Sequence, residues 1–293
     1  MRFARILVPL DGSRLAEAVL PAACSVARRL GATLMLLHVL EHEPPAAVHG
    51  EPHLVDRDGA LAYLEREAAQ LRLEGIPVES HVHERPVEDV APAVDAHVHE
   101  FGADLIAMCA HGRSNLRTRL IGSIAERILR AGSVPVLLRT VRRSDAPAFE
   151  LRRLLVPIDF GHDVDAALAA ASLLAPPYGA AVTLLAAPER PAPTTSRLLP
   201  GTSALMRAYD LDTLRDRLAE LAQTLRGQVP AVEAVVASDP PTEAILDAAD
   251  ALPADLIVLV TDAHGGLASW YGPSTGQQLL KRPDLTLLLI REL

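Results

Sequence analysis

The amino-acid sequence contains one pattern twice, and this duplication constrains the fold more than any other feature. The segment ARILVPLDGS at residues 4–13 returns as RRLLVPIDFG at residues 152–161. The offset is close to half the chain, which indicates a duplicated domain and not a short-repeat solenoid. We therefore predict two domains, residues 1–141 and residues 150–293, separated by the polar, proline-bearing stretch TVRRSDAPAFE.

Short apolar runs alternate with helical patterns along the first half. Uninterrupted apolar runs of this length indicate strands that are buried on both faces, as in a parallel sheet. Because the second half follows the same order, the sequence predicts an α/β fold with two tandem Rossmann-like domains, each a five-stranded parallel sheet flanked by helices. The predicted strands of the first half are Arg5–Pro9, Thr33–Val39, Pro77–His83, Leu105–Cys109 and Val134–Leu138.

Capping signals delimit the helices between these strands. Ser13 is a candidate N-cap and Gly31 a helix stop, whereas Pro86 is a candidate opening residue for a later helix. Pro92 lies inside that later helix and marks either a kink or a later start. The predicted helices are residues 13–31, 60–75, 85–102 and 120–132.

Charge and composition exclude several classes of protein. The net charge of −9 argues against general nucleic-acid binding, because phosphate backbones attract a basic face. No apolar run approaches the ~20 residues of a membrane helix, and the first apolar run is too short for a signal peptide. With Cys24 and Cys109 as the two cysteines, a disulfide framework is not expected, so we predict a cytoplasmic protein.

Three features fall at the predicted carboxyl ends of strands, where open parallel sheets bind their ligands. Asp11 could accept hydrogen bonds from ribose hydroxyls, or could cap a helix and set a turn. Val39 could form an apolar wall for a base, or could be an ordinary core residue. The third feature is the stretch CAHGRSNLRTRLIGSIAE at 109–126, in which glycines and a helix N-terminus could hold phosphate.

The order of these motifs resembles the universal stress protein family, and the duplicated layout is similar to its tandem members. The resemblance rests on VPLDGS, on LHVLE and on the long stretch ADLIAMCAHGRSNLRTRLIGSIAERILRAGSVPVLLR. ATP-binding members share the pattern Gly-x2-Gly-x9-Gly-Ser/Thr, of which Gly112, Gly122 and Ser123 satisfy the second and third parts. Cys109 stands where the pattern has its first glycine.

This resemblance implies an adenine nucleotide alpha hydrolase-like version of the Rossmann fold that binds ATP, with Mg²⁺ accompanying the nucleotide. It also implies that the last strands of the two domains pair, which would form an internal pseudo-dimer, and a further homodimer stays open. Adenine and ribose would lie against Pro9, Leu10, Asp11 and Val39. The phosphate side would be lined by Met108, Cys109, Gly112, Arg113, Gly122, Ser123 and Ile124.

The second half departs further from the family pattern. Six residues separate Gly265 from Gly272, and Pro273 precedes Ser274. A shorter loop stiffened by proline, which lacks an N–H group, should not wrap a triphosphate in the same way. We therefore expect a degenerate phosphate loop in this domain, which is structural or binds another ligand.

Other chemistries have weaker support. Lys281 is the single lysine and no Gly-x4-Gly-Lys-Ser/Thr motif occurs, which excludes an ordinary P-loop enzyme. His81 and His83 share one face of a strand, whereas His97 and His99 diverge on a helix. We predict no metal site and interpret these histidines as solvated polar residues. Cys109 is interpreted as a packed strand-end residue, with a redox-sensitive thiol as the alternative.

These observations predict an adenine-nucleotide-binding stress-response regulator. Two alternatives stay open, namely an interaction scaffold of the same fold that has lost nucleotide binding, and a slow ATPase. The sequence shows no nucleophile with an oriented base and no pair of carboxylates at compatible positions, so we predict no catalytic residues. We expect neither a nucleic-acid nor a membrane partner.

Overall fold

The computed structural model describes the chain except for residues 49, 111–122, 132, 142–147, 189–201, 262–274, 283–284 and 292–293. The first half contains β1 (Arg5–Pro9), α1 (Arg14–Glu17), α2 (Leu20–Leu30), β2 (Thr33–Glu41), β3 (Ala47–Val48), β4 (Glu51–Pro52), α3 (Arg57–Leu73), β5 (Val78–Val87), α4 (Val90–Phe101), β6 (Leu105–Ala110), α5 (Ser123–Ala131) and β7 (Val136–Thr140). The second half contains β8 (Arg153–Pro157), α6 (Val164–Tyr178), β9 (Ala181–Ala186), α7 (Thr202–Leu225), β10 (Ala231–Val236), α8 (Pro241–Ala251), β11 (Leu256–Thr261), α9 (Thr275–Lys281) and β12 (Thr286–Arg291).

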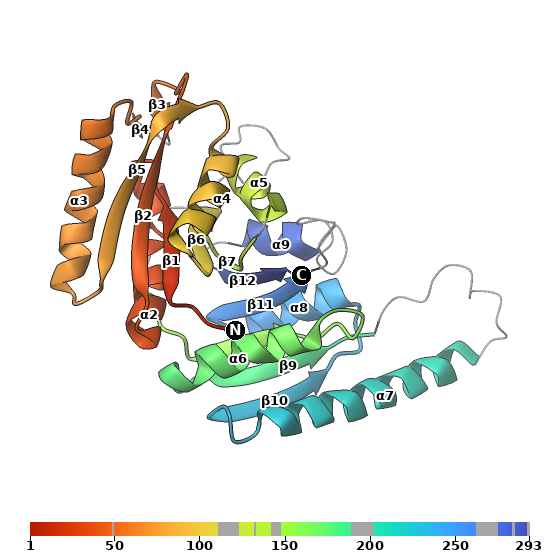
Figure 1. The fold of residues 1–293 in the computed structure, drawn as a ribbon. Coiled ribbons are helices and arrows are strands. Elements are labelled where there is room, and N and C mark those ends of the chain that lie inside the picture. Colours follow the sequence, from red (N-terminus) through yellow and green to blue (C-terminus); the bar gives the residue numbers. More distant parts are fainter. Residues whose placement is uncertain are drawn as a thin grey trace.

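Both halves contribute to one ten-stranded sheet in the order β10-β9-β8-β11-β12-β7-β6-β1-β2-β5 (Figure 1). Within each half the paired strands are parallel, whereas β7 and β12 pair antiparallel at the centre. The strand order of one half is therefore repeated in the other half, and the two halves meet at the central pair of strands, β7 and β12. The predicted fold class, with two five-stranded parallel sheets and paired last strands, is confirmed.

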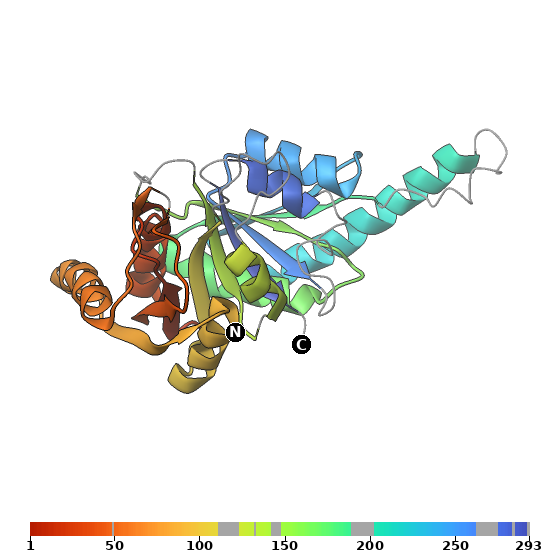
Figure 2. The ribbon, with the colours of Figure 1, turned by 90° about the horizontal axis from the view of Figure 1, so that it is seen from above.

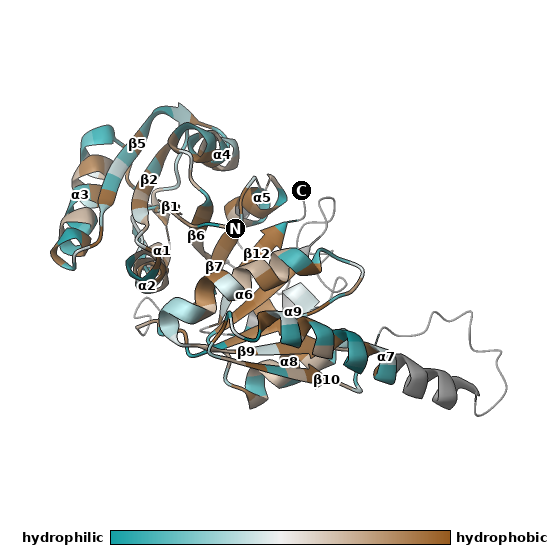
Figure 3. Ribbon diagram, turned by 60° about the horizontal axis from the view of Figure 1, so that its bottom comes forward, coloured by the Kyte–Doolittle hydropathy of each residue, from teal (hydrophilic) through white to brown (hydrophobic). Residues whose placement is uncertain are grey.

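Helices cover both faces of this sheet and enclose two cores (Figures 1 and 2). One core lies between the sheet and α1, α2, α3, α6 and α7, and the other between the sheet and α4, α5, α8 and α9. Figure 3 shows apolar residues concentrated in the central strands, as expected for strands covered on both sides. Among the described residues, no helix is long and apolar enough to cross a bilayer.

The central seam is apolar and is reinforced by polar contacts between the halves. Leu138 of β7 lies opposite Leu287 of β12, and both side chains are fully buried. Beyond this pair, Thr140 donates its Oγ1 hydrogen to the carbonyl of Arg282 at 2.6 Å, next to the end of α9. Arg291 donates from Nη1 to the carbonyl of Arg130 in α5 at 3.0 Å. Each last strand thus contacts the carboxyl end of a helix in the other half.

The predicted helix at 13–31 is two helices, so that prediction is wrong in part. Ser13 is the N-cap of α1, and Gly31 ends α2 in the left-handed conformation at φ 67°, as predicted. Between them α1 stops at Glu17 and α2 begins at Leu20. Pro21 explains the interruption, because its ring blocks the continuous helical hydrogen-bond pattern and is tolerated only in a first turn.

The predicted start of the next helix at Pro86 is also wrong. Pro86 belongs to β5, and α4 begins at Val90 with Asp89 as its N-cap, accepting from the Ala91 N–H group at 3.0 Å. Pro92 therefore lies in the first turn of α4, where a missing N–H costs no hydrogen bond. The later start, one of the two alternatives for Pro92, is the correct one.

Candidate functional site

The candidate site lies at the point where the strand order of the first half reverses. From β1, the chain continues outward through β2 and β5 on one side, and through β6 and β7 on the other. Parallel strands at such a switch point leave a crevice beyond their carboxyl ends, where α/β proteins bind ligands. The strands that end there are β1 at Pro9, β2 at Glu41 and β6 at Ala110.

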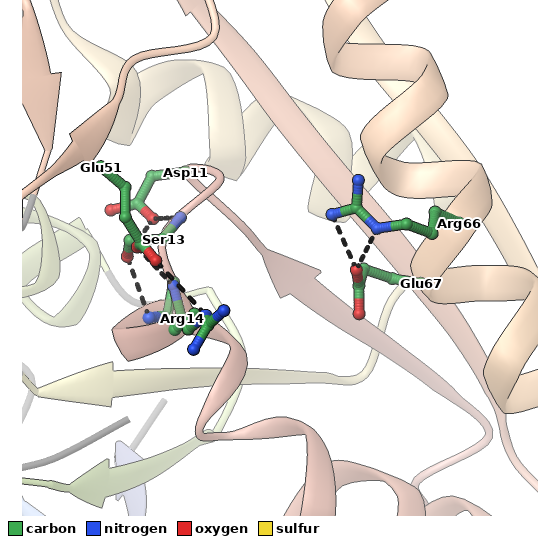
Figure 4. Close-up of polar contacts among 7 residues, drawn as sticks. Asp11, Ser13, Arg14, Glu51, Arg66 and Glu67 are labelled. Atoms are coloured by element: carbon green, nitrogen blue, oxygen red, sulfur yellow. Dashed lines mark hydrogen bonds and ion pairs between the residues drawn. The ribbon is translucent and has the colours of Figure 1, made fainter. Parts of the chain in front are cut away.

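Asp11 sets the turn between β1 and α1. Its Oδ1 accepts from the Ser13 backbone N–H at 2.9 Å and from the Ser13 hydroxyl at 2.6 Å. The buried Ser13 hydroxyl in turn accepts from the N–H of Ala16 at 3.1 Å (Figure 4). The turn-setting alternative for Asp11 therefore describes its local structure, while its contact with ribose stays a prediction.

A buried histidine from the neighbouring strand supports the same turn. His38 of β2 donates from Nδ1 to the carbonyl of Leu10 at 2.7 Å. Burial is the main cause that lowers the pKa of His38, which favours the neutral form of the ring. His38 was not among the residues predicted from the sequence, although a polar residue in the apolar run of β2 is a signal that could have found it.

The apolar candidates divide between the two faces of the sheet. Val39 and Met108 are buried in the core on the α4 and α5 side, and Ile124 of α5 packs against that core. Leu10 and Cys109 are buried in the core on the α1 and α2 side. Successive residues of a strand point to opposite faces of the sheet. The strand ends therefore lie together, but the side chains of these candidate residues are divided between the two faces.

Cys109 is a packed core residue. Its side chain is buried, and burial raises the pKa of the thiol to about 12 against the lowering effect of nearby Arg139. A thiol with a raised pKa is a poor nucleophile. The packing interpretation therefore accounts for Cys109, and the redox alternative has no support from its surroundings.

The phosphate-loop prediction lies mostly outside the described residues. Gly112, Arg113 and Gly122 belong to the stretch 111–122 that the structure does not describe. Helix α5 begins at Ser123, directly after that stretch and within the predicted helix at 120–132, and it lies close to α4. A salt bridge of 3.1 Å between Arg127, in the middle of α5, and Asp89, at the start of α4, connects the two helices.

A segment that sequence reasoning missed covers the Asp11 turn. This strap (residues 50–54) passes over the start of α1, and the Oε2 atom of Glu51 accepts from the backbone N–H of Arg14 at 2.8 Å (Figure 4). Leu54 lies so close to Gly12 that a Cβ atom there would be 2.8 Å from its Cδ1 atom. The residues of the strap form no periodic apolar pattern, so no local sequence signal identifies this segment.

The corresponding turn of the second half differs chemically. Asp159 accepts from the N–H of Gly161 at 2.9 Å through Oδ1, and from Nδ1 of His162 at 2.8 Å through Oδ2. Both of its carboxylate oxygens are thus engaged within their own loop. Gly272, Pro273 and Ser274 lie outside the described residues, so the degenerate phosphate loop stays a prediction.

The buried His97 and the half-buried His81 and His83 form a packed cluster between β5 and α4, which corrects their interpretation as solvated residues, whereas the His99 side chain is 69% exposed, as that interpretation expects. His83 Nδ1 lies 3.0 Å from His97 Nε2, and His97 Nδ1 lies 2.8 Å from Glu100 Oε2. The ring of His97 stacks on Phe101 and meets His81 edge-on. Within the part of the chain that the structure describes, no group of three or more potential ligands is arranged to hold a metal ion.

This cluster predicts an acid-sensitive contact between β5 and α4. Burial is the largest cause that lowers the pKa of His97, so protonation favours the unfolded chain. The stability that the neutral ring contributes is therefore fully present above the histidine pKa of the unfolded state. It is lost as the pH falls through the lower pKa of the folded state. We expect His97→Gln to reduce the loss of stability between pH 7 and pH 5 by up to about 2 kcal/mol, because an unfolded-state histidine that titrates near pH ~6.5 contributes at most about 1.4 kcal/mol per pH unit below that value. Urea unfolding at both pH values measures this difference.

The exposed His99 provides the matched control. His99→Gln should leave the acid sensitivity of the wild-type protein unchanged. Equal acid sensitivity in His97→Gln and wild type would show that the cluster does not titrate during acid unfolding.

Comparison with known proteins gives a consistent result for both halves. The model of the universal stress protein family matches residues 2–139 and again residues 150–291. A universal stress protein of Mycobacterium tuberculosis is 30% identical over 137 residues, which cover 46% of this chain and 45% of that protein. The chain thus spans about half the length of this curated relative. The Bacillus subtilis universal stress protein YxiE is 25% identical over 149 residues, covering 46% of this chain and 98% of its own length.

Solved structures show the same fold over the whole chain. A universal stress protein from Archaeoglobus fulgidus superposes with a TM-score of 0.69 at 18% identity, covering 99% of this chain and 97% of that one. A putative universal stress protein from Pseudomonas aeruginosa gives a TM-score of 0.65 at 20% identity, covering 99% and 93% respectively. At these identities the likeness concerns the fold alone.

Proposed function

Because the chain belongs to the universal stress protein family, we propose that its N-terminal half binds ATP or another adenine nucleotide and acts as a stress-response regulator. The observation that carries this proposal is the meeting of the β1, β2 and β6 carboxyl ends at the switch point, with the start of α5 following β6. Crevices of this kind bind nucleotides in other α/β folds.

The residues of the first half suit such a ligand. Asp11 stands at the end of β1, where a carboxylate can accept hydrogen bonds from ribose. Val39 and Met108 give the neighbouring strand ends an apolar character suited to a base. The backbone N–H groups at the start of α5, and Arg113 in the preceding stretch of sequence, would bind the phosphates, whose negative charge Mg²⁺ would help to neutralise.

The proposal is tested by measuring nucleotide binding directly. Mass spectrometry of the purified protein should detect an adenine nucleotide, and calorimetry should show heat of binding with ATP. Gly122→Val should weaken binding about 100-fold or more, equal to about 2.7 kcal/mol, because a branched side chain prevents close approach of the backbone to phosphate.

Gly272→Val is the matched control in the second half and should leave the affinity within about twofold. If ATP gives no heat at millimolar concentration and no nucleotide co-purifies, the alternative of an interaction scaffold replaces this proposal. Phosphate release in a single turnover that is lost in Asp11→Ala would instead support a slow ATPase. A cytoplasmic location and a homodimer stay predictions, the latter measurable by light scattering.

A further inference from the structure

The two edges of the ten-stranded sheet differ in how they are protected. Strand β5 ends the sheet on the side of the first half, and β10 ends it on the side of the second half (Figure 1). An edge strand presents backbone N–H and C=O groups that no neighbouring strand binds, so it can pair with a strand of another chain unless it is blocked.

The β5 edge is blocked. Because the N–H group of Leu34 in β2 donates to the carbonyl of Pro77, the next carbonyl, that of Val78, points away from β2. The guanidinium group of Arg72 in α3 donates to this outward carbonyl from Nε at 3.2 Å and from Nη2 at 2.9 Å. Further along, β5 contains charged residues and Pro86, which natural edge strands use to prevent pairing.

The β10 edge is open. The N–H group of Ala237 donates to the carbonyl of Ala186 in β9 at 2.9 Å, so alternate residues of β10 direct their backbone groups away from β9. These outward residues are Val232, Ala234 and Val236. Among the described residues, no hydrogen bond engages their outward N–H and C=O groups.

Helix α7 leaves the middle of this edge accessible. Val232 and Val236 pack against the core on the α7 side of the sheet. Ala234 points to the same face, because side chains alternate along a strand, but it is exposed. Val235 packs against the core on the other face. The strand is thus anchored to both cores, while its backbone edge stays open.

We propose that β10 is the contact surface for a second copy of this chain, and that two β10 strands pair antiparallel about a twofold axis at Ala234. The three outward residues of each copy form about six hydrogen bonds, and the two sheets become continuous. The chain already uses this mode of pairing, because β7 and β12 pair antiparallel at its centre. The interface depends on no nucleotide, and β10 lies at the opposite end of the sheet from β1 and β2.

Charge selects a second copy and the register of the pair. Outward residues must face outward residues, so the axis nearest the middle of the strand passes through either Glu233 or Ala234. An axis at Glu233 places two carboxylates directly opposite each other, which is destabilising. An axis at Ala234 instead places Glu233, the single charged residue of β10, opposite Val235 of the second copy. The strand is therefore complementary to itself in one register.

Association should be weak and reversible. A pair of six-residue strands buries less than the roughly 1,200 Å² of a standard interface, and the net charge of −9 on each copy adds repulsion. We expect a Kd on the order of 10–100 μM. Sedimentation velocity of the full-length protein without nucleotide, from ~1 to ~500 μM, measures this constant.

A proline in the middle of the edge should prevent the pairing. Ala234→Pro removes an outward N–H group without removing a hydrogen bond to β9, so it should raise the Kd at least about tenfold. Ala234→Ser keeps the N–H group and is the matched control, with the Kd of wild type. Circular dichroism measures whether both variants are folded.

A second variant acts in the opposite direction, which a loss of folding cannot imitate. Glu233→Thr removes the charge that faces Val235, a contact that occurs twice in the dimer, and should lower the Kd about tenfold. Glu79→Thr makes the same change in the blocked strand β5 and should leave the Kd unchanged. An unchanged Kd in Glu233→Thr overturns the register at Ala234.

Disulfide cross-linking tests the register directly. In an antiparallel pair centred on residue 234, the two Cα atoms there lie about 5.5 Å apart, within the range that a disulfide spans. Ala234→Cys should therefore form a covalent dimer under mild oxidation at ~100 μM, above the expected Kd. In Glu233→Cys the two Cα atoms lie diagonally about 7–8 Å apart, so this variant is the control. The native Cys24 and Cys109 are both buried.

Three results overturn the interface, namely a wild-type protein that is monomeric at ~500 μM, a folded Ala234→Pro variant that associates like wild type, and equal cross-linking of the two cysteine variants. The second result would mean that another surface joins the copies. If Ala234→Pro does not fold, Glu233→Thr and the cross-linking decide.

Discussion

Replacing Leu138 by aspartate will lower the free energy of unfolding by about 5 kcal/mol or more, which removes most of the stability of an ordinary domain. Leu138 is fully buried in β7, opposite Leu287 of β12. Loss of the buried leucine costs about 2–3 kcal/mol. Keeping a buried carboxyl group protonated at neutral pH costs roughly 4 kcal/mol more, the equivalent of about three pKa units.

Chemical denaturation and thermal unfolding will measure this loss, with the soluble yield as a further indicator. Leu73→Asp is the control, because Leu73 is 90% exposed and its replacement should change stability by less than about 0.5 kcal/mol. A Leu138→Asp protein as stable as wild type would mean that β7 and β12 do not form the buried centre of the sheet.

Replacing Gly12 by alanine will destabilise the protein by about 2–4 kcal/mol. Gly12 has φ of +87°, where a side chain is strained by roughly 1–2 kcal/mol. The new Cβ would also lie 2.8 Å from Leu54, and such overpacking costs about 1–3 kcal/mol. Because the strap must move, we expect nucleotide affinity to fall in the same variant.

Gly50 separates the two costs. It has φ of +92°, and apart from its chain neighbours no atom of the described residues lies within 4 Å of the position that a Cβ atom would take there, so Gly50→Ala should show the backbone strain without the overpacking. Adding Leu54→Ala to Gly12→Ala should recover part of the lost stability. Urea unfolding of wild type, Gly12→Ala, Leu54→Ala and the double variant measures the coupling between the two positions. Equal destabilisation by Gly12→Ala and Gly50→Ala would contradict the close contact with Leu54.

The fold was predictable because its signals are local and are repeated. Uninterrupted apolar runs predict the inner strands of each half, whereas the edge strands β5 and β10 mix polar and apolar residues and are mostly exposed or half-buried. The duplicated pattern predicts the pairing of similar halves. Errors occurred where proline interrupts or delays a helix, at Pro21 and Pro92. Pro21 was visible in the sequence, but an apolar stripe that continues on both sides of it concealed the break.

The candidate site was only partly predictable, because its supporting contacts join residues that are distant in the chain. Asp11 follows an apolar run and was found by position. His53 and Glu41 are twelve residues apart and meet only because the chain returns through β3 and β4 to the end of β2. The contact between His83 and His97 likewise depends on how α4 packs against β5, which spacing along the chain does not reveal.

The antiparallel pairing of β7 with β12 has a further consequence for how the two sites can change. In a dimer of identical subunits, association depends on protein concentration and every substitution occurs twice. Here one polypeptide supplies both partners, so a high effective concentration keeps the seam formed on dilution. Each half can also be altered alone, and the turns at Asp11 and Asp159 already differ in their hydrogen-bond partners. The protein therefore has the architecture of a dimer in which the two halves can acquire different functions while they stay associated.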